Sequence, residues 1–181
     1  ALVLGPGLGR EPETLALAAS IVATSTLPLV IDADALQPEI VRAGMARRIL
    51  TPHAGEFARI ERAVPDHATL VLKGPVTRIA NGKAIAAVAG TKRGRKHRAA
   101  GGVVYHSFFG GPVLARGGSG DLLAGLIGGL LAQRPSEPLL AAARGVVWHG
   151  LAADALAQAR GATAVTVTEL LEHLAGVLRE V

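Results

Sequence analysis

The segment from Ala115 to Gly125 of this 181-residue chain reads ARGGSGDLLAG and leads into an apolar stretch. Its glycines let the backbone turn tightly and bring bare N–H groups close to a ligand, and a helix N-terminus that follows would attract an anion. Asp121 comes next, and a carboxylate beside a phosphate can remove a proton from an attacking hydroxyl group. The structural alternative is that Ser119 caps the helix and Asp121 stabilises its dipole.

A second glycine loop, GPGLG at residues 5–9, lies between a predicted strand and a predicted helix. It departs from the GxGxxG pattern of dinucleotide-binding proteins, although Asp32 supplies an acidic residue after the next strand. The loop predicts either backbone contact with a ligand or a tight structural turn. Asp32 and Asp34 end the second strand, where carboxylates of an open α/β sheet can meet a metal, a hydroxyl or a ribose, or can serve as helix caps.

The motif TPHAGE at residues 51–56 follows the third predicted strand. By the same logic of strand ends, His53 could donate a hydrogen bond to a substrate oxygen, and Glu56 could hold a magnesium-bound water. A single histidine in a turn also fits a purely structural role.

The motif LKGPVT at residues 72–77 follows the fourth predicted strand. Lys73 and Thr77 flank a glycine turn and could reach the phosphates of a nucleotide, although the order of residues is not that of a Walker A loop. The alternative is a surface lysine at the end of a strand. Trp148 and His149 lie in a long apolar helix, where we expect both to pack.

Short apolar runs alternate with helix-length segments, which predicts one α/β domain over residues 1–181. Asn81-Gly82 predicts a type I′ hairpin between strands 77–80 and 83–88. Thr166 and Glu169 have capping-box spacing before the last helix. The remaining strands are expected at 2–4, 29–32, 48–50, 69–73 and 103–106, and the helices at 11–23, 38–43, 55–61, 121–132, 137–158 and 167–181.

The composition bounds the possible functions. Half of the residues are hydrophobic and none is cysteine, so a core is expected and disulfides and thiolate metal sites are excluded, which favours a cytoplasmic location. The longest apolar run is too short to cross a bilayer. The net charge of +5 comes from one stretch, and we interpret residues 90–102 as an inserted basic loop. A solvated loop is expected there, with a nucleic-acid-binding arm as the alternative.

Taken in order, GPGLG, DADAL, TPHAGE, LKGPVT and GGSGDLLAG resemble the ADP/ATP-dependent NAD(P)H-hydrate dehydratases of the ribokinase-like superfamily. The resemblance runs from Gly5 to about Leu171 and implies a three-layer α/β/α fold with a mostly parallel central sheet. It implies that a nucleotide phosphate is transferred to the hydroxyl of hydrated NADH or NADPH, NAD(P)HX, and that phosphate is then eliminated. It further implies ADP or ATP as phosphoryl donor, Mg²⁺, and a homo-oligomer, by family analogy a tetramer.

The resemblance also implies roles for matched residues. Asp121 would be the base that contacts the hydrated nicotinamide, with Gly7 and His53 as further contacts to the hydrate. Gly120 would contact the adenine nucleotide, and the amides of Gly118 and Gly120 would form an anion hole. The nucleotide would be held by the loop of Lys73, Gly74, Pro75, Val76 and Thr77.

This sequence departs from the family pattern in two places. Ala54 replaces the family's proline in TPHPGE. Family members also carry about a hundred residues before the first motif, so we expect an N-terminally truncated domain whose sheet exposes an edge. Two alternatives therefore stay open: a kinase of the same superfamily acting on a vitamin precursor, and a truncated fragment that binds a nucleotide without catalysis.

Overall fold

The computed structural model describes residues 1–89 and 103–178. The predicted basic loop at residues 90–102 lies outside the described residues. Within the described ranges, no helix has the length and apolar character needed to cross a membrane.

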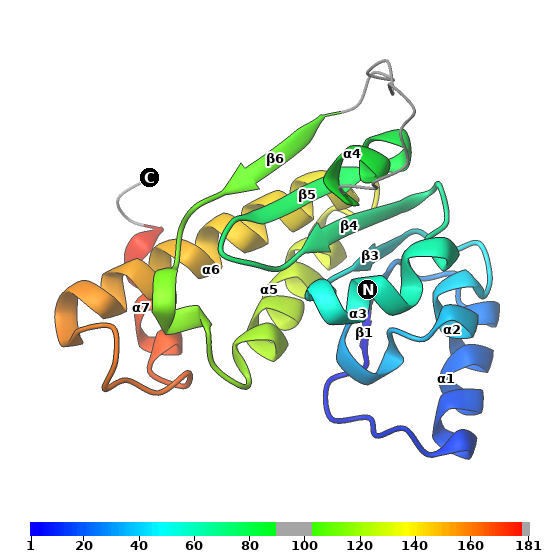
Figure 1. Ribbon diagram of the computed structural model, residues 1–181, viewed down its shortest axis with the longest axis horizontal. Helices are drawn as coiled ribbons and strands as arrows, with labels where there is room; N and C mark the ends of the chain where they lie inside the picture. Colours follow the sequence, from blue (N-terminus) through cyan, green and yellow to red (C-terminus); the bar gives the residue numbers. More distant parts are fainter. Residues whose placement is uncertain (90–102, 179–181) are drawn as a thin grey trace.

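Within these residues the strands form one six-stranded sheet in which spatial order follows chain order (Figure 1). The first four strands run parallel, β5 is antiparallel to β4, and β6 is antiparallel to β5. The expected mostly parallel sheet is therefore confirmed. The strands are β1 (Leu2–Leu4), β2 (Leu29–Ile31), β3 (Arg48–Leu50), β4 (Ala68–Leu72), β5 (Thr77–Asn81) and β6 (Val104–Ser107).

Helices cover both faces of the sheet, which confirms the three-layer architecture (Figure 1). One layer contains α1 (Pro12–Thr24), α2 (Pro38–Arg42), α3 (Ala54–Ile60) and α4 (Ile85–Ala89). The other contains α5 (Ser119–Gln133) and α6 (Pro138–Arg160), and α7 (Leu170–Val177) packs against α6. Short 3-10 turns lie at η1 (Ala33–Ala35), η2 (Glu61–Ala63), η3 (Gly82–Ala84) and η4 (Gly111–Leu114).

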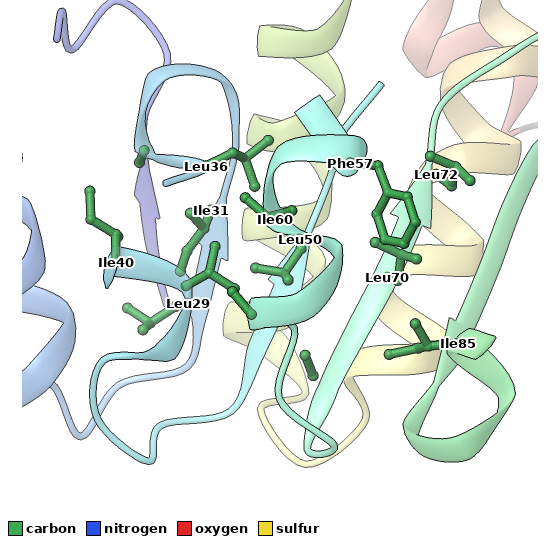
Figure 2. Packing of buried hydrophobic residues seen from close by; sticks show 14 of the residues in the cluster. Leu29, Ile31, Leu36, Ile40, Leu50, Phe57, Ile60, Leu70, Leu72 and Ile85 are labelled. Carbon is green, nitrogen blue, oxygen red and sulfur yellow. The ribbon is translucent and has the colours of Figure 1, made fainter. Parts of the chain in front are cut away.

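Alternating residues of each parallel strand supply the two cores. Leu29 and Ile31 of β2 point into the layer of α1, α2 and α3 (Figure 2), whereas Val30 between them packs against α5 and α6. Residues of a strand alternate between faces, so a continuous apolar run buries side chains on both sides of a covered sheet. The sheet is thus held rigidly between two helix layers, and its strand ends have fixed positions.

The predicted hairpin at Asn81-Gly82 is wrong. Asn81 is extended, with φ −130° and ψ 161°, and only Gly82 has the positive φ that a type I′ turn requires at both central residues. Residues 83–88 form the η3 turn and helix α4, whose Ile85 and Val88 are buried in the core. Alanine favours helix over strand, and this local preference prevailed over the turn dipeptide.

The last helix begins three residues later than predicted, at Leu170. The Glu169 carboxylate accepts hydrogen bonds from the backbone N–H and the hydroxyl of Thr166, so one half of the expected capping box forms. These bonds, the backbone N–H first, lower the pKa of Glu169. The Thr166 hydroxyl donates to the carboxylate instead of accepting from the helix, so residues 167–169 make a tight turn before α7.

Candidate functional site

The predicted motifs meet at one edge of the sheet. The loops after β1, β2, β3 and β4 all leave from the carboxyl ends of parallel strands. Because β5 and β6 alternate in direction, Thr77 at the start of β5 and Ser107 at the end of β6 lie at this same edge (Figure 1). In open α/β sheets this edge is where ligands bind.

An ion pair joins two of these loops. Lys73 Nζ lies 2.9 Å from Asp32 Oδ1, and the Asp32 side chain is 1% exposed. The backbone N–H of Lys73 donates to the carbonyl of Pro52 at 2.8 Å, which fixes the start of the loop. A carboxylate so deeply buried needs a charged partner, and Lys73 supplies it while remaining partly accessible.

The N-terminus of α5 lies directly over this ion pair. A Cβ placed on Gly120 would lie 3.0 Å from Lys73 Nζ and 3.6 Å from Asp32 Oδ2. The helix is capped by Gly118, with φ 86°, and no side chain caps it. Ser119 is the first helical residue, so the interpretation of Ser119 as the cap is wrong. A helix N-terminus without a side-chain acceptor and a lysine ammonium together favour an anion.

A cavity of about 630 Å³ opens beside Lys73. Its wall is mainly apolar, with polar groups from the β4–β5 loop and from α6, which is the usual composition of a site for a small organic ligand. Four of the five loop residues predicted to hold a nucleotide line it, and Val76 does not. Gly118 and Gly120, which were also predicted to contact the nucleotide, are not among the lining residues. The lining residues are Lys73, Gly74, Pro75, Thr77, Phe109, Gly111, Pro112, Leu114, Ala115, Leu123, Val146 and His149.

Asp121 faces a different hollow. It is exposed and lines an apolar groove of about 420 Å³ between α5, α6 and α7, with Leu126, Trp148 and Leu174 among the other lining residues. Gly120 and Asp121 are adjacent in the chain, yet one faces the ion pair and the other faces this groove. The first turn of α5 therefore separates the two hollows.

Arg116, which the sequence analysis did not single out, holds the glycine loop in place. Its guanidinium donates to the carbonyls of Pro112 and Val113 in the η4 turn before the glycine loop, and to those of Ala162 and Thr163 after α6. Arginine has five donors in a rigid fork, so one side chain can bridge both segments. The residue before the glycines thus positions the N-terminus of α5.

The GPGLG loop is held mainly by contacts with the segment that follows β2. A Cβ on Gly5, with φ 124°, would lie 1.8 Å from the carbonyl oxygen of Asp32. Gly9 N–H donates to Asp34 Oδ2 at 3.2 Å, and Arg10 Nε lies 2.8 Å from Asp34 Oδ1. Gly7, the predicted substrate contact, is exposed and has open space around its Cβ position. Asp34 therefore has a structural role, and Gly7 is the accessible part of the loop.

His53 and Glu56 cap helix α3 reciprocally. His53 Nδ1 accepts from the N–H groups of Gly55 and Glu56, and Glu56 Oε2 accepts from the His53 N–H at 2.8 Å. Since Nδ1 is an acceptor, the neutral ring carries its proton on Nε2, which lies 3.4 Å from Glu56 Oε1. The His53 ring is 62% exposed, so Nε2 can also reach a ligand.

Among the described residues, no hydrogen bond or ion pair joins Asp121 to Gly7 or to His53. The same residues contain no group of three or more side chains suited to hold a metal ion. Mg²⁺ in nucleotide sites commonly takes one or two carboxylates, with phosphates and waters completing its shell. The carboxylates at this edge fit that mode, in which the nucleotide supplies the remaining ligands.

His149 packs in α6 as expected, but it also lines the cavity, which the sequence analysis missed. Its side chain is buried, and burial first, then the charge of Lys73, lowers its pKa to about 4. The imidazole is therefore neutral at neutral pH. The available signal was its place next to Gly150, since glycine in a helix marks close approach by another segment.

The sheet covered on both faces, with its ligand edge and anion-favouring helix terminus, defines an α/β protein of the ribokinase-like class. Residues 1–175 match the family model for NAD(P)H-hydrate dehydratase (Carb_kinase). The chain belongs to this family.

Individual relatives agree with this assignment. The chain is 34% identical to the bifunctional NAD(P)H-hydrate repair enzyme Nnr of Moorella thermoacetica and 37% identical to that of Gloeobacter violaceus, over 98% and 87% of the chain. It spans only 34% and 30% of those proteins. The crystal structure of Bacillus subtilis ADP/ATP-dependent NAD(P)H-hydrate dehydratase, co-crystallised with ATP/Mg²⁺, superposes with a TM-score of 0.76 at 27% identity, covering 98% of this chain and 63% of that one.

Proposed function

We propose that this chain carries the nucleotide-dependent dehydration of NAD(P)HX to NADH or NADPH. The observation that carries the proposal is the meeting of Lys73, Asp32 and Gly120 at the N-terminus of α5, beside a cavity large enough for a nucleotide. Family membership supports the reaction class.

The nucleotide would lie along the loop from Lys73 to Thr77, with its transferred phosphate facing the amides of Gly118 and Gly120. These donors and the Lys73 ammonium would stabilise the charge that develops on the phosphoryl group. Lys73 Nζ has three N–H donors, so it could donate to an anion there while keeping its contact with Asp32. Mg²⁺, bound with the nucleotide, would neutralise part of the phosphate charge, with Glu56 contacting one of its waters.

Asp121 would act as the base. It would remove the proton from the hydrate's hydroxyl as that oxygen bonds to phosphorus and the bond to the leaving nucleotide breaks. The C–O bond then breaks with its electron pair on the departing phosphate. The adjacent ring carbon loses a proton, and the electrons of that C–H bond form the restored ring double bond. Gly7 and the Nε2–H of His53 would contact the hydrate. Asp121 is exposed on the first turn of α5 and follows Gly120 directly in the chain, which supports its placement next to the transferred phosphate.

The donor is proposed to be ADP or ATP, and by family analogy we propose a homo-oligomer, a tetramer, acting in the cytoplasm. The experiment is a dehydration assay on NADHX and NADPHX with each donor and Mg²⁺. Asp121→Asn is expected to abolish turnover while leaving ADP affinity nearly unchanged, measured by absorbance and by calorimetry. Turnover near the wild-type level would contradict the assignment of the base.

The two alternatives give different results in the same assay. A vitamin-precursor kinase would release a stable phosphorylated alcohol, which mass spectrometry of the products detects. A fragment that only binds nucleotide would show a rise in unfolding temperature with ADP and Mg²⁺ but no turnover.

A further inference from the structure

Two buried polar groups beside the cavity lack hydrogen-bond partners. Among the described residues, three buried side-chain polar atoms make no hydrogen bond: Ser107 Oγ, Glu137 Oε2 and His149 Nε2. Glu137 Oε2 lies 3.5 Å from Arg134 Nη1 in an ion pair, which leaves Ser107 and His149. An unpaired buried polar group destabilises the folded protein, so two of them in one region point to a partner that the chain itself does not supply.

Ser107 lies on the sheet face next to Thr77, which lines the cavity, and His149 lines the cavity itself. Ser107 is the register partner of Thr77 in the β5–β6 ladder, and paired residues of antiparallel strands project from the same face. Ile79, two residues after Thr77, packs against α5 and α6, so Thr77 and Ser107 also face that layer. Thr77 and His149 both line the cavity. The two unpaired groups thus come from the sheet and from the helix that together enclose it.

The position of His149 is fixed by the residues around it on α6. A Cβ on Gly150 would lie 2.5 Å from Phe109 Cβ, so the helix and the segment after β6 are in close contact. Asp154, one turn further along, accepts a hydrogen bond from Gly110 N–H at 3.0 Å. The segment after β6 is therefore attached to α6 immediately beside His149, which fixes the position of this residue in the cavity wall.

The chemistry of this wall indicates the part of the ligand that it contacts. A neutral imidazole has one donor and one acceptor, and a serine hydroxyl can do both. Lys73, which lines the same cavity, adds a positive charge. This combination matches an oxygen-rich, anionic group better than the edge of a base.

We propose that His149, together with Ser107 on the adjoining sheet face, is a specificity-determining residue that hydrogen-bonds the sugar–phosphate portion of a nucleotide in this cavity. The inference rests on the proposed function, because it takes the nucleotide to occupy the cavity beside Lys73. It adds the α6 helix and the last residue of β6 to the binding site.

The test measures ADP binding by calorimetry, in the presence of Mg²⁺, for the wild-type chain and for His149→Leu, His149→Gln and Ser107→Ala. We expect His149→Leu to weaken ADP binding at least about tenfold and His149→Gln to weaken it less, because an amide can still hydrogen-bond. Without nucleotide, the unfolding temperature of His149→Leu should equal or exceed the wild-type value, since an unpaired buried polar group is removed.

A role in core packing alone predicts the opposite combination, with altered stability and unchanged ADP affinity, and that result would overturn the inference. Equal weakening of free adenine and of ADP would also overturn it, because the contact would then be to the base. If the wild-type chain itself fails to bind ADP, the proposed function fails; if it binds ADP as tightly as His149→Leu does, only the role of His149 fails.

Discussion

The two glycine-containing ends of this sheet edge differ in how they use their polar groups. On the β1–β2 side, the GPGLG loop and Asp34 form bonds with each other, and Gly5 fits against the carbonyl of Asp32. On the β4–β6 side, the α5 N-terminus has no side-chain cap, and Ser107 and His149 are unpaired. Similar glycine patterns thus serve two purposes. On the first side the polar groups bond to one another, and on the second side backbone N–H groups and side chains stay available to a ligand.

The strongest test of the first side is Gly5→Ala. The new Cβ would lie 1.8 Å from a backbone oxygen at a φ of 124°, so neither the side chain nor the strand can move cheaply. We expect the free energy of unfolding to fall by about 4 kcal/mol or more, as measured by urea denaturation. A stable variant would mean that this loop is not tied to β2 as described.

The free energy of unfolding should depend on pH because of His149, which lies on the second side. Its pKa is lowered from 6.5 to about 4 by burial and by Lys73, so the unfolded chain binds the proton more readily. The free energy of unfolding is therefore unaffected by protonation of His149 above pH 6.5. It decreases as the pH falls from 6.5 toward 4, by about 1.4 kcal/mol per pH unit and about 3 kcal/mol in all. The difference in unfolding free energy between the wild type and His149→Leu, measured across this range, isolates the effect; a flat difference would contradict it.

Gly120→Ala tests whether the second side is kept open for a ligand. Its methyl group would lie 3.0 Å from Lys73 Nζ, the far end of a flexible side chain, so the fold should tolerate it. We expect ADP affinity to fall at least about tenfold with little loss of stability. Gly176→Ala in α7, where the added methyl meets open space, is the matched control and should leave ADP binding unchanged.

The smallest effect is expected for Gly7→Ala. No atom lies within 4 Å of its Cβ position, so only the φ of 64° is unfavourable, which costs about 1 kcal/mol. Thermal unfolding would measure the contrast with Gly5→Ala. An equally large loss of stability in Gly5→Ala and Gly7→Ala would contradict the distinction between the packed position of Gly5 and the accessible position of Gly7.

The sequence predicted the sheet edge well because strand ends are marked by local signals. The strand at 48–50 matches β3. Asp32 and Lys73, each predicted at the end of a strand, meet because parallel strands share one edge of the sheet. The error at Asn81-Gly82 shows the limit of a dipeptide signal when the following residues prefer a helix. Residues 85–89 form a helix in which Ile85 and Val88 are buried in the core, and this is a tertiary contact that the dipeptide does not encode.

The site residues were harder to predict in detail. His53 with Glu56 has the spacing of a capping box, but histidine is an unusual cap, so the sequence did not separate this role from substrate contact. His149 looked like any residue of an apolar helix, since its cavity forms only when α6 packs against β5 and the segment after β6. The roles of Asp121, Gly7 and the Lys73 loop stay predictions.

The consecutive strand order has a consequence for how this molecule folds. Each strand pairs with its neighbour in the chain, so each ladder closes a shorter loop than a contact between α5 and β1 does, and the shorter loop costs less entropy. Helix α5 differs, because Gly128 packs directly against Val3 and joins distant parts of the chain. We therefore expect the sheet to assemble before α5 docks. The N-terminus of α5 would then reach its place beside Lys73 late, after the sheet around it has already formed.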